Sequence, residues 1–168
     1  MLILDIDYYD GLIDITHASD FVTVSNSHLH DHFKASLVGH VDSNSVEDTG
    51  FLHVTYANNH FENLFSRGPS IRFGTAHVFN NYYTNCPDGI NARMGAQVLA
   101  ESNTWYQTKK PLYSTDAGYA VARGNNFGNG KDEALPGSFT KAPYACNVAN
   151  APSVAPNSSG CTLSFSSS

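Results

Sequence analysis

The segment Asn80-Asn81-Tyr82-Tyr83, near the middle of the chain, belongs to a series of similar segments spaced at an almost fixed interval. The other members are Asn58-Asn59-His60-Phe61, Ser102-Asn103-Thr104-Trp105 and Asn125-Asn126-Phe127. The interval from Asn59 to Asn81 equals that from Asn81 to Asn103, and the interval from Asn103 to Asn126 is one residue longer. An aromatic residue stands two positions after the first three of these asparagines, and a short apolar stretch precedes each member of the series.

A repeat of this length, made of short strands and turns, predicts one turn of a solenoid. Each turn buries its apolar side chains only by stacking on the next turn. Identical polar residues at equivalent corners can then hydrogen-bond in a ladder along the axis, as asparagines do in stacked sheets. The alternative is that asparagine is simply common in turns. That alternative explains single asparagines, but it does not explain why they recur at a constant interval together with an aromatic residue.

The period also predicts where one turn is interrupted. The alternating stretch Val22-Thr23-Val24-Ser25 is followed by Asn26, which precedes Asn59 by one and a half times the usual interval. The polar, glycine-bounded segment 39–50 accounts for the excess and reads as an inserted loop, where sites are often built. We therefore expect about five turns over residues 1–130, followed by an irregular tail over residues 131–168 that packs on the coil.

Composition and charge narrow the class of protein. The 168 residues predict one domain, and the periodic stretches are rich in Val, Ile, Thr, Tyr and Phe, as strands are. No apolar run is long enough to span a membrane, and a formal net charge of −6 argues against a nucleic-acid partner. The sequence therefore predicts an all-β protein that binds neither a membrane nor nucleic acid.

The two ends differ from the periodic part. Met1-Leu2-Ile3-Leu4 lacks the features of a signal peptide. A strand begins almost at once without a cap, so we expect the chain to lack the first turns of a longer solenoid. In the tail, Cys146 and Cys161 could form a disulfide worth about 3 kcal/mol, which would leave Cys86 buried and unpaired. The triplet Asn157-Ser158-Ser159 is a glycosylation sequon and favours secretion.

Two carboxylates near the start are candidate metal ligands. If the stretch from Asp10 to Ile15 is one extended strand, Asp10 and Asp14 share a face while Ile13 and Ile15 point the other way. Carboxylate oxygens at this spacing suit a hard cation such as calcium. The equally weighted alternative is two solvated aspartates on an exposed face.

Three basic side chains stand out in a central region that is poor in them: Lys34, Arg67 and Arg72. On an acidic protein, three cations together with a carboxylate pair indicate an anionic ligand that also binds a metal. The alternative for any single arginine is a surface ion pair.

Three alternating histidines, His28, His30 and His32, raise the possibility of a zinc site on one strand face. No partner ligand stands at a recognisable sequence spacing from them. Packing and turn structure are therefore the favoured interpretation.

The stretches 10–15, 30–40 and 67–74 resemble the pectate lyases of polysaccharide lyase family 1, most closely the secreted fungal members. The pattern Arg67-Gly68-Pro69-Ser70-Ile71-Arg72 together with the upstream Lys34 carries the resemblance. It covers nearly the whole chain but only about the second half of a family member. It implies a right-handed parallel β-helix and a monomeric, secreted enzyme that cleaves α-1,4-polygalacturonate by calcium-dependent β-elimination.

The same resemblance implies roles for single residues. Asp10 and Asp14 resemble two of the calcium ligands, Arg67 resembles the catalytic base, and Lys34 and Arg72 resemble residues that bind substrate carboxylates. A further calcium-ligating aspartate of the family has no counterpart here.

Three other functions remain open at this point. One is a pectin lyase, which acts on methyl-esterified polymer without calcium. Another is a truncated β-helix fragment that binds polyuronate with little or no catalysis. The last is a purely structural solenoid, which the set Lys34, Arg67 and Arg72 disfavours.

Overall fold

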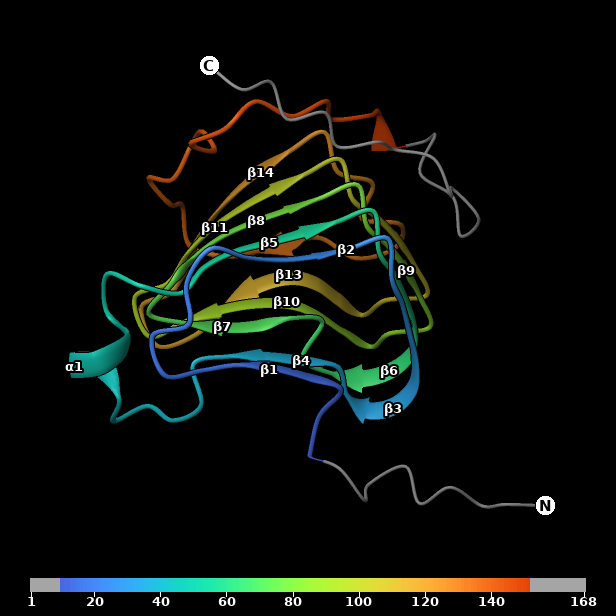
Figure 1. Ribbon diagram of the computed structural model, residues 1–168. Helices are drawn as coiled ribbons and strands as arrows, with labels where there is room; N and C mark the ends of the chain where they lie inside the picture. Colours follow the sequence, from blue (N-terminus) through green and yellow to red (C-terminus); the bar gives the residue numbers. More distant parts are fainter. Residues whose placement is uncertain (1–9, 152–168) are drawn as a thin grey trace.

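The computed structural model describes residues 10–151, which wind into a parallel β-helix of three sheets (Figure 1). Sheet A has six strands: β1 (Ile13–Ile15), β4 (Ser36–Val38), β7 (Ser70–Arg72), β10 (Asp88–Arg93), β13 (Lys110–Ser114) and β15 (Asp132–Glu133). Sheet B has five: β2 (Val22–Ser25), β5 (His53–Ala57), β8 (Thr75–Phe79), β11 (Gln97–Glu101) and β14 (Tyr119–Arg123). Sheet C has four: β3 (His28–Lys34), β6 (His60–Ser66), β9 (Tyr82–Thr84) and β12 (Thr104–Tyr106). The all-β solenoid predicted from the repeat is confirmed.

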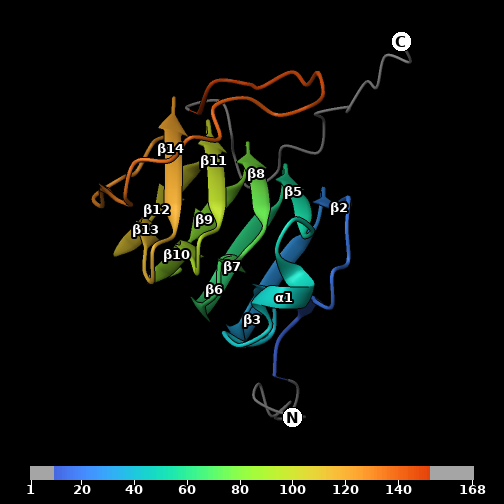
Figure 2. The same ribbon diagram turned by 90° about the vertical axis from the view of Figure 1, so that its left-hand side faces the viewer.

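Each of the first four described turns contributes one strand to each sheet, so that equivalent residues of successive turns become lateral neighbours. Thr75 pairs with Gln97 in sheet B, and Tyr82 pairs with Thr104 in sheet C. Figure 2 shows the strands of sheet B standing side by side in the order β14, β11, β8, β5, β2. The one described helix, α1 (Ser45–Asp48), lies in the segment between β4 and β5. No helix among residues 10–151 is long and apolar enough to cross a membrane.

The asparagine ladder exists, but its phase differs at both ends from the sequence prediction. The backbone N–H of Asn59 donates to Oδ1 of Asn81, and that of Asn81 donates to Oδ1 of Asn103, both at 3.0 Å. The next member is Asn125, whose Oδ1 accepts from the N–H of Asn103 at 2.8 Å. Asn126 is not the ladder residue; it pairs with Thr104 instead. The true period is therefore constant along the ladder, at 22.

At the other end, Ser27 stands where Asn26 was expected. The N–H of Ser27 donates to Oδ1 of Asn59 at 3.1 Å, whereas Asn26 has a positive φ of 51°. The equivalent corner residues also have positive φ: Asn58, Asn80, Ser102 and Gly124. Asparagine and glycine tolerate this left-handed conformation better than other residues. The residue with positive φ thus turns the chain, and the residue that follows it takes the ladder position.

An aromatic stack runs inside the coil beside the ladder. The rings of Phe61, Tyr83, Trp105 and Phe127 stack in sequence with centroids 4.7, 4.9 and 5.3 Å apart. Each of these residues lies two positions after a ladder asparagine, so four members of the series carry the aromatic residue. The first three rings are almost completely buried. Ring stacking of this kind adds about 0.5–1.5 kcal/mol per pair beyond the burial of apolar surface.

The segment after β14 packs back over sheet B. The N–H of Gly137 donates to the carbonyl of Ala120 at 2.9 Å, and Ala149 exchanges two hydrogen bonds with the side chain of Asn80. Farther along the sheet, the hydroxyl of Tyr144 lies 2.7 Å from Oγ1 of Thr55 and 2.9 Å from Nδ1 of His77. Cys161 and the Asn157-Ser158-Ser159 sequon lie outside the described residues, as do Met1 and the start of the chain, so the disulfide with Cys146 stays a prediction.

A pH dependence follows from His77, which is buried between Tyr144 and Glu101. Burial lowers its pKa below the ordinary 6.5, and the Glu101 carboxylate, 2.9 Å away, only partly opposes this effect. The unfolded chain therefore binds a proton more readily than the folded chain. The stabilisation from neutral His77 is complete above pH 6.5 and is lost as the pH falls through the lower folded pKa.

We expect His77→Gln to reduce the dependence of the thermal midpoint on pH below 6.5. The measurement is a series of melting curves at decreasing pH for the wild type and the variant. His53→Gln, at a partly exposed ion pair with Asp20 in the same sheet, is the matched control. Parallel pH curves for the wild type and His77→Gln would contradict the prediction.

Candidate functional site

Asp10, Lys34 and Arg67 meet at the corner where the chain passes from sheet C to sheet A. Nζ of Lys34 donates to Oδ1 of Asp10, and Nη1 of Arg67 lies 3.8 Å from Oδ2 of the same carboxylate. Backbone hydrogen bonds connect this corner in one turn to the same corner in the next turn. The N–H of Ala35 donates to Ser66 at 2.9 Å, and the N–H of Leu12 donates to Ala35 at 3.1 Å. Three residues distant in sequence are therefore brought together by the register of the coil.

Arg67 is held in an unusual local conformation. Its φ is 63°, and the following Gly68–Pro69 peptide bond is cis. The carboxylate of Asp88 accepts hydrogen bonds from the N–H of Arg67 at 3.2 Å and from the hydroxyl of Ser66 at 3.0 Å. A Cβ at Gly68 would lie 3.2 Å from the carbonyl oxygen of Asp88, so a larger residue would be tightly packed between the turns. Asp88 thus fixes the backbone from which the guanidinium projects.

The guanidinium of Arg67 keeps unused hydrogen-bonding capacity. Nη1 is buried and has no hydrogen-bond partner among the described residues, because its 3.8 Å approach to Asp10 is an ion pair and too long for a hydrogen bond. A buried polar atom without a partner is costly, and such atoms in a folded protein often mark a binding or catalytic position. The Nη1 atom of Arg67 is therefore free to form a hydrogen bond with a ligand.

The charge state of Asp10 follows from its neighbours. The hydrogen bond and the positive charge of Lys34 lower the pKa of Asp10 below its ordinary value, with Arg67 contributing in the same direction. Asp10 is exposed, so solvent screens these effects. The carboxylate stays ionised over the whole neutral range.

Arg72 lies at the other end of β7 and has different partners. Its Nε donates to Asp42 at 2.5 Å, and its Nη1 donates to the carbonyl of Gly39 at 2.7 Å. Arg93, the lateral neighbour of Arg72 in β10, also reaches Asp42, at 3.2 Å. The structure therefore does not join Arg72 to the Asp10–Lys34–Arg67 group. Asp42 was not identified from the sequence, since only the fold brings the segment after β4 over this strand.

Asp14 stands on β1 with its side chain exposed, between Ile13 and the buried Ile15. The expected strand from residue 10 to residue 15 is too long, because β1 begins at Ile13 and Asp10 lies in a bend before it. The two carboxylates are therefore exposed, as expected, but not on one continuous strand.

The carboxylates fit calcium in chemical type. Calcium takes about six to eight oxygen ligands, often from Asp side chains, with water completing the shell. Asp10 and Asp14 offer carboxylate oxygens on the exposed surface, but Asp10 must first leave Lys34. Among residues 10–151 no third His, Cys, Asp or Glu converges with this pair. Other oxygens would have to come from water or from a ligand.

The three alternating histidines do not share one strand face, which agrees with the favoured interpretation that they do not form a zinc site together. Asp31 has a positive φ of 52°, and this left-handed residue shifts the alternation of β3. His28 and His30 remain exposed, but His32 turns inward. There, its Nδ1 lies 2.9 Å from the carbonyl oxygen of Lys34. The three histidines cannot bind one ion together.

Comparisons with known proteins agree with the fold. The sequence profile of the family described as "Pectate lyase" matches residues 5–155. The chain is 61% identical over 144 residues to "Probable pectate lyase A" of Neosartorya fischeri, covering 86% of this chain and 45% of that protein. It is 57% identical over 164 residues to "Pectate lyase A" of Emericella nidulans, covering 96% of this chain and 50% of that one. The chain thus spans about half the length of the curated relatives it matches.

Solved structures give the same result. A pectate lyase from Bacillus sp. N165 in complex with trigalacturonate superposes with a TM-score of 0.75 at 34% identity, covering 89% of this chain and 51% of that chain. Pectate lyase C from Erwinia chrysanthemi, at pH 9.5 with 30 mM Ca2+, gives a TM-score of 0.75 at 28% identity, covering 87% of this chain and 47% of that chain. With its coiled fold, its Arg67 motif and a profile match over most of its length, this chain belongs to the pectate lyase family.

Proposed function

We propose that this chain carries the catalytic corner of a secreted, monomeric, calcium-dependent pectate lyase that cleaves α-1,4-polygalacturonate to unsaturated oligogalacturonides. The observation that supports this proposal most directly is the unpartnered Nη1 of Arg67 beside the Asp10–Lys34 pair. The trigalacturonate bound by a structural relative supports the substrate class. An acidic cell-wall polymer as substrate supports a place of action outside the cell.

In the proposed reaction, Arg67 acts as a base in its neutral guanidine form and accepts the proton from C5 of a galacturonate unit. The electrons of that C–H bond form a C4=C5 double bond, and the C4–O bond breaks. The glycosidic oxygen leaves with its electron pair and takes a proton from solvent. Removing a proton beside a carboxylate builds negative charge, so the transition state needs positive charge near that carboxylate. Lys34 is proposed to supply part of it.

Asp10 controls which contacts the two cations can make. While it pairs with Lys34 and Arg67, it occupies the ammonium group and attracts the guanidinium. If Asp10 turns toward a cation that it shares with Asp14, Lys34 is freed to bind a uronate carboxylate. The negative charge beside Arg67 is then reduced. Bound calcium would supply further positive charge against the uronate carboxylate.

Arg72 is proposed to bind a second substrate carboxylate. Its guanidinium is already held by Asp42 and Gly39, which fixes its orientation. Asp42 also divides its charge between Arg72 and Arg93. Arg72 is therefore an oriented, partly neutralised cation that keeps a uronate in register along sheet A.

The direct experiment is ultraviolet absorbance of unsaturated uronide during incubation of this chain with polygalacturonate, with calcium and then with chelator. A rise that stops with chelator is expected. Activity on methyl-esterified pectin that persists in chelator would instead indicate a pectin lyase.

A second candidate function is binding of polyuronate without catalysis. The observation in its favour is that the chain spans about half the length of its relatives. A flat absorbance trace from folded protein that co-sediments with polygalacturonate would support this second function over the first.

Asp14→Asn is expected to raise the calcium concentration for half-maximal rate about tenfold, because one charged oxygen ligand is lost. Glu133→Gln, at an exposed ion pair with Lys131, is the matched control and should behave as the wild type. Unchanged calcium dependence in Asp14→Asn would remove Asp14 from the proposed site.

A further inference from the structure

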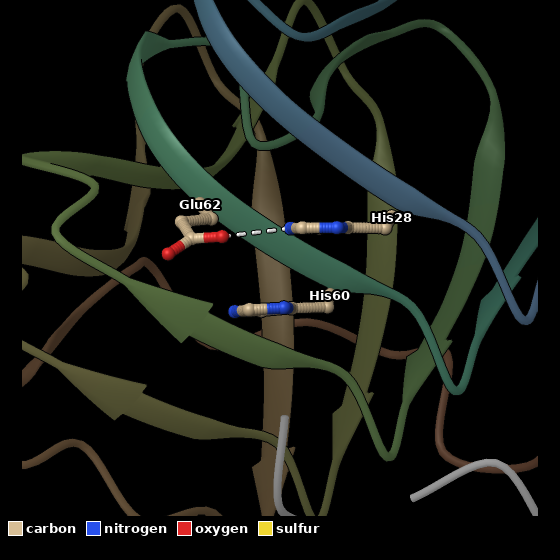
Figure 3. Close-up of side chains that lie close together, drawn as sticks. All are labelled: His28, His60 and Glu62. Carbon is tan, nitrogen blue, oxygen red and sulfur yellow. Dashed lines mark hydrogen bonds and ion pairs between the residues drawn. The ribbon is translucent and has the colours of Figure 1, made fainter. Parts of the chain in front are cut away.

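His28, His60 and Glu62 converge on the outer face of sheet C, on the first two turns of the coil (Figure 3). His28 of β3 and His60 of β6 are lateral neighbours, and their rings stack at 4.5 Å with an angle of 3° between planes. Nε2 of His28 lies 2.8 Å from Oε2 of Glu62. One nitrogen or oxygen of each side chain lies within 4.8 Å of those of the other two. Among residues 10–151 no other three His, Cys, Asp or Glu side chains meet in this way.

The donor set selects a class of ion. Two imidazoles and one carboxylate suit divalent ions such as zinc and copper, whereas calcium prefers oxygen ligands alone. Zinc binds imidazole nitrogen at about 2.0–2.1 Å, so the ligand atoms of a tetrahedral site stand about 3.3 Å apart. The two rings stack almost parallel, so binding one ion requires side-chain rotations that turn a nitrogen of each ring toward a common point. His28 and Glu62 are partly exposed and can make these rotations without disturbing the core.

We propose that His28, His60 and Glu62 form a transition-metal site that takes Zn2+ or Cu2+ and clips the first two turns of the coil together. The ligands come from residues 28 and 60–62, which belong to adjacent turns. A bound ion therefore crosslinks β3 and β6 and favours the folded state over the unfolded chain.

The surroundings support a metal site at this position. Oγ1 of Thr84 lies 3.2 Å from Nε2 of His60 and orients the ring. The ring of His30, tilted by 32° against that of His28 at a centroid distance of 4.4 Å, stands beside the site with Asp31 at its Nδ1. A metal has an open side for water or a fourth ligand here.

A second histidine pair in the chain provides an internal control. His17 and His40 stack at 4.4 Å, and His17 pairs with Glu47 at 3.1 Å. The residue types match those of the proposed site, but their donor atoms do not converge. Surface histidines that bind metal without a built site would use both places alike.

The site lies at the start of β3, whereas Lys34 ends that strand. The proposal therefore stands apart from lyase activity, and its test uses the full chain without an affinity tag. Cu2+ is titrated and followed by electron paramagnetic resonance, and Zn2+ is titrated by calorimetry in the presence of excess Ca2+. The variants are His28→Gln, His60→Gln and Glu62→Gln, with His17→Gln as the control.

The expected result is a 1:1 site in the wild type and in His17→Gln, with two imidazole nitrogens coupled to copper. His28→Gln and His60→Gln should each show a single coupled nitrogen and at least tenfold weaker zinc binding, while Glu62→Gln should keep both nitrogens and bind zinc more weakly. Zinc should raise the melting temperature of the wild type but not of His60→Gln. Equal binding by all variants, or displacement of zinc by calcium, would overturn the proposal.

Discussion

Arg67→Ala is expected to lower the turnover rate on polygalacturonate by about 10²–10⁴-fold, the contribution of a positioned general base. The guanidinium projects from a backbone fixed by Asp88 and has an unbonded Nη1. Arg67→Lys should fail as well, because an ammonium group on a flexible stem cannot reproduce the planar fork. The measurement is the steady-state rate of unsaturated uronide formation at saturating calcium.

The kinetic pattern separates the proposed roles of Arg67 and Lys34. Loss of a group that acts only in the transition state lowers kcat and leaves KM nearly unchanged, whereas loss of a substrate contact raises KM. We therefore expect Arg67→Ala to affect mainly kcat and Lys34→Ala to raise KM. Arg123→Ala, which removes an exposed side chain that pairs with Glu101 on sheet B, is the matched control. Near-normal kcat in Arg67→Ala would exclude Arg67 as the base.

Asn81→Ala is expected to cost about 3–4 kcal/mol of unfolding free energy, since each buried group left without a partner costs about 1–3 kcal/mol. Oδ1 of Asn81 accepts from the N–H and from Nδ2 of Asn59, both at 3.0 Å. Its own Nδ2 donates to the carbonyl of Tyr56 at 2.9 Å. Alanine leaves the N–H of Asn59 and the carbonyl of Tyr56 in an apolar interior.

Denaturation in urea, followed by circular dichroism, measures this loss. Asn126→Ala is the matched control because its side chain is exposed and accepts one hydrogen bond, from the N–H of Gly128 at 3.1 Å. That substitution should cost less than about 0.5 kcal/mol. Asn125→Ala should cost more than Asn126→Ala, because Asn125 accepts from the N–H of Asn103. Equal losses for Asn81→Ala and Asn126→Ala would contradict the ladder as the source of stability.

The fold could be predicted because every turn of a solenoid needs similar residues at equivalent positions. Because the turns have constant length, residues with the same role recur at the same interval in the sequence. The ladder residues Asn59, Asn81 and Asn103 are one example, and the stacked rings of Tyr83 and Trp105 are another. The exact phase could not be predicted where two asparagines stand together. Asn125 and Asn126 are equally good turn residues, and only the backbone pairing of Asn126 with Thr104 decides between them. Asn26 and Ser27 differ for the same reason, since a left-handed corner residue precedes each ladder residue.

The sequence by itself determined the coil and its period, because each turn repeats the same short pattern. It also identified five candidate site residues by their type and local motif: Asp10, Asp14, Lys34, Arg67 and Arg72. Only the tertiary structure decided how they meet. It brought Asp10 into contact with Lys34 and Arg67, and it paired Arg72 with Asp42. The left-handed conformation of Asp31 turned His32 away from His28. It also placed His60 and Glu62, which belong to the following turn, beside His28. The physical reason is that lateral register between turns is set by backbone hydrogen bonds across the whole coil, and no local spacing encodes it.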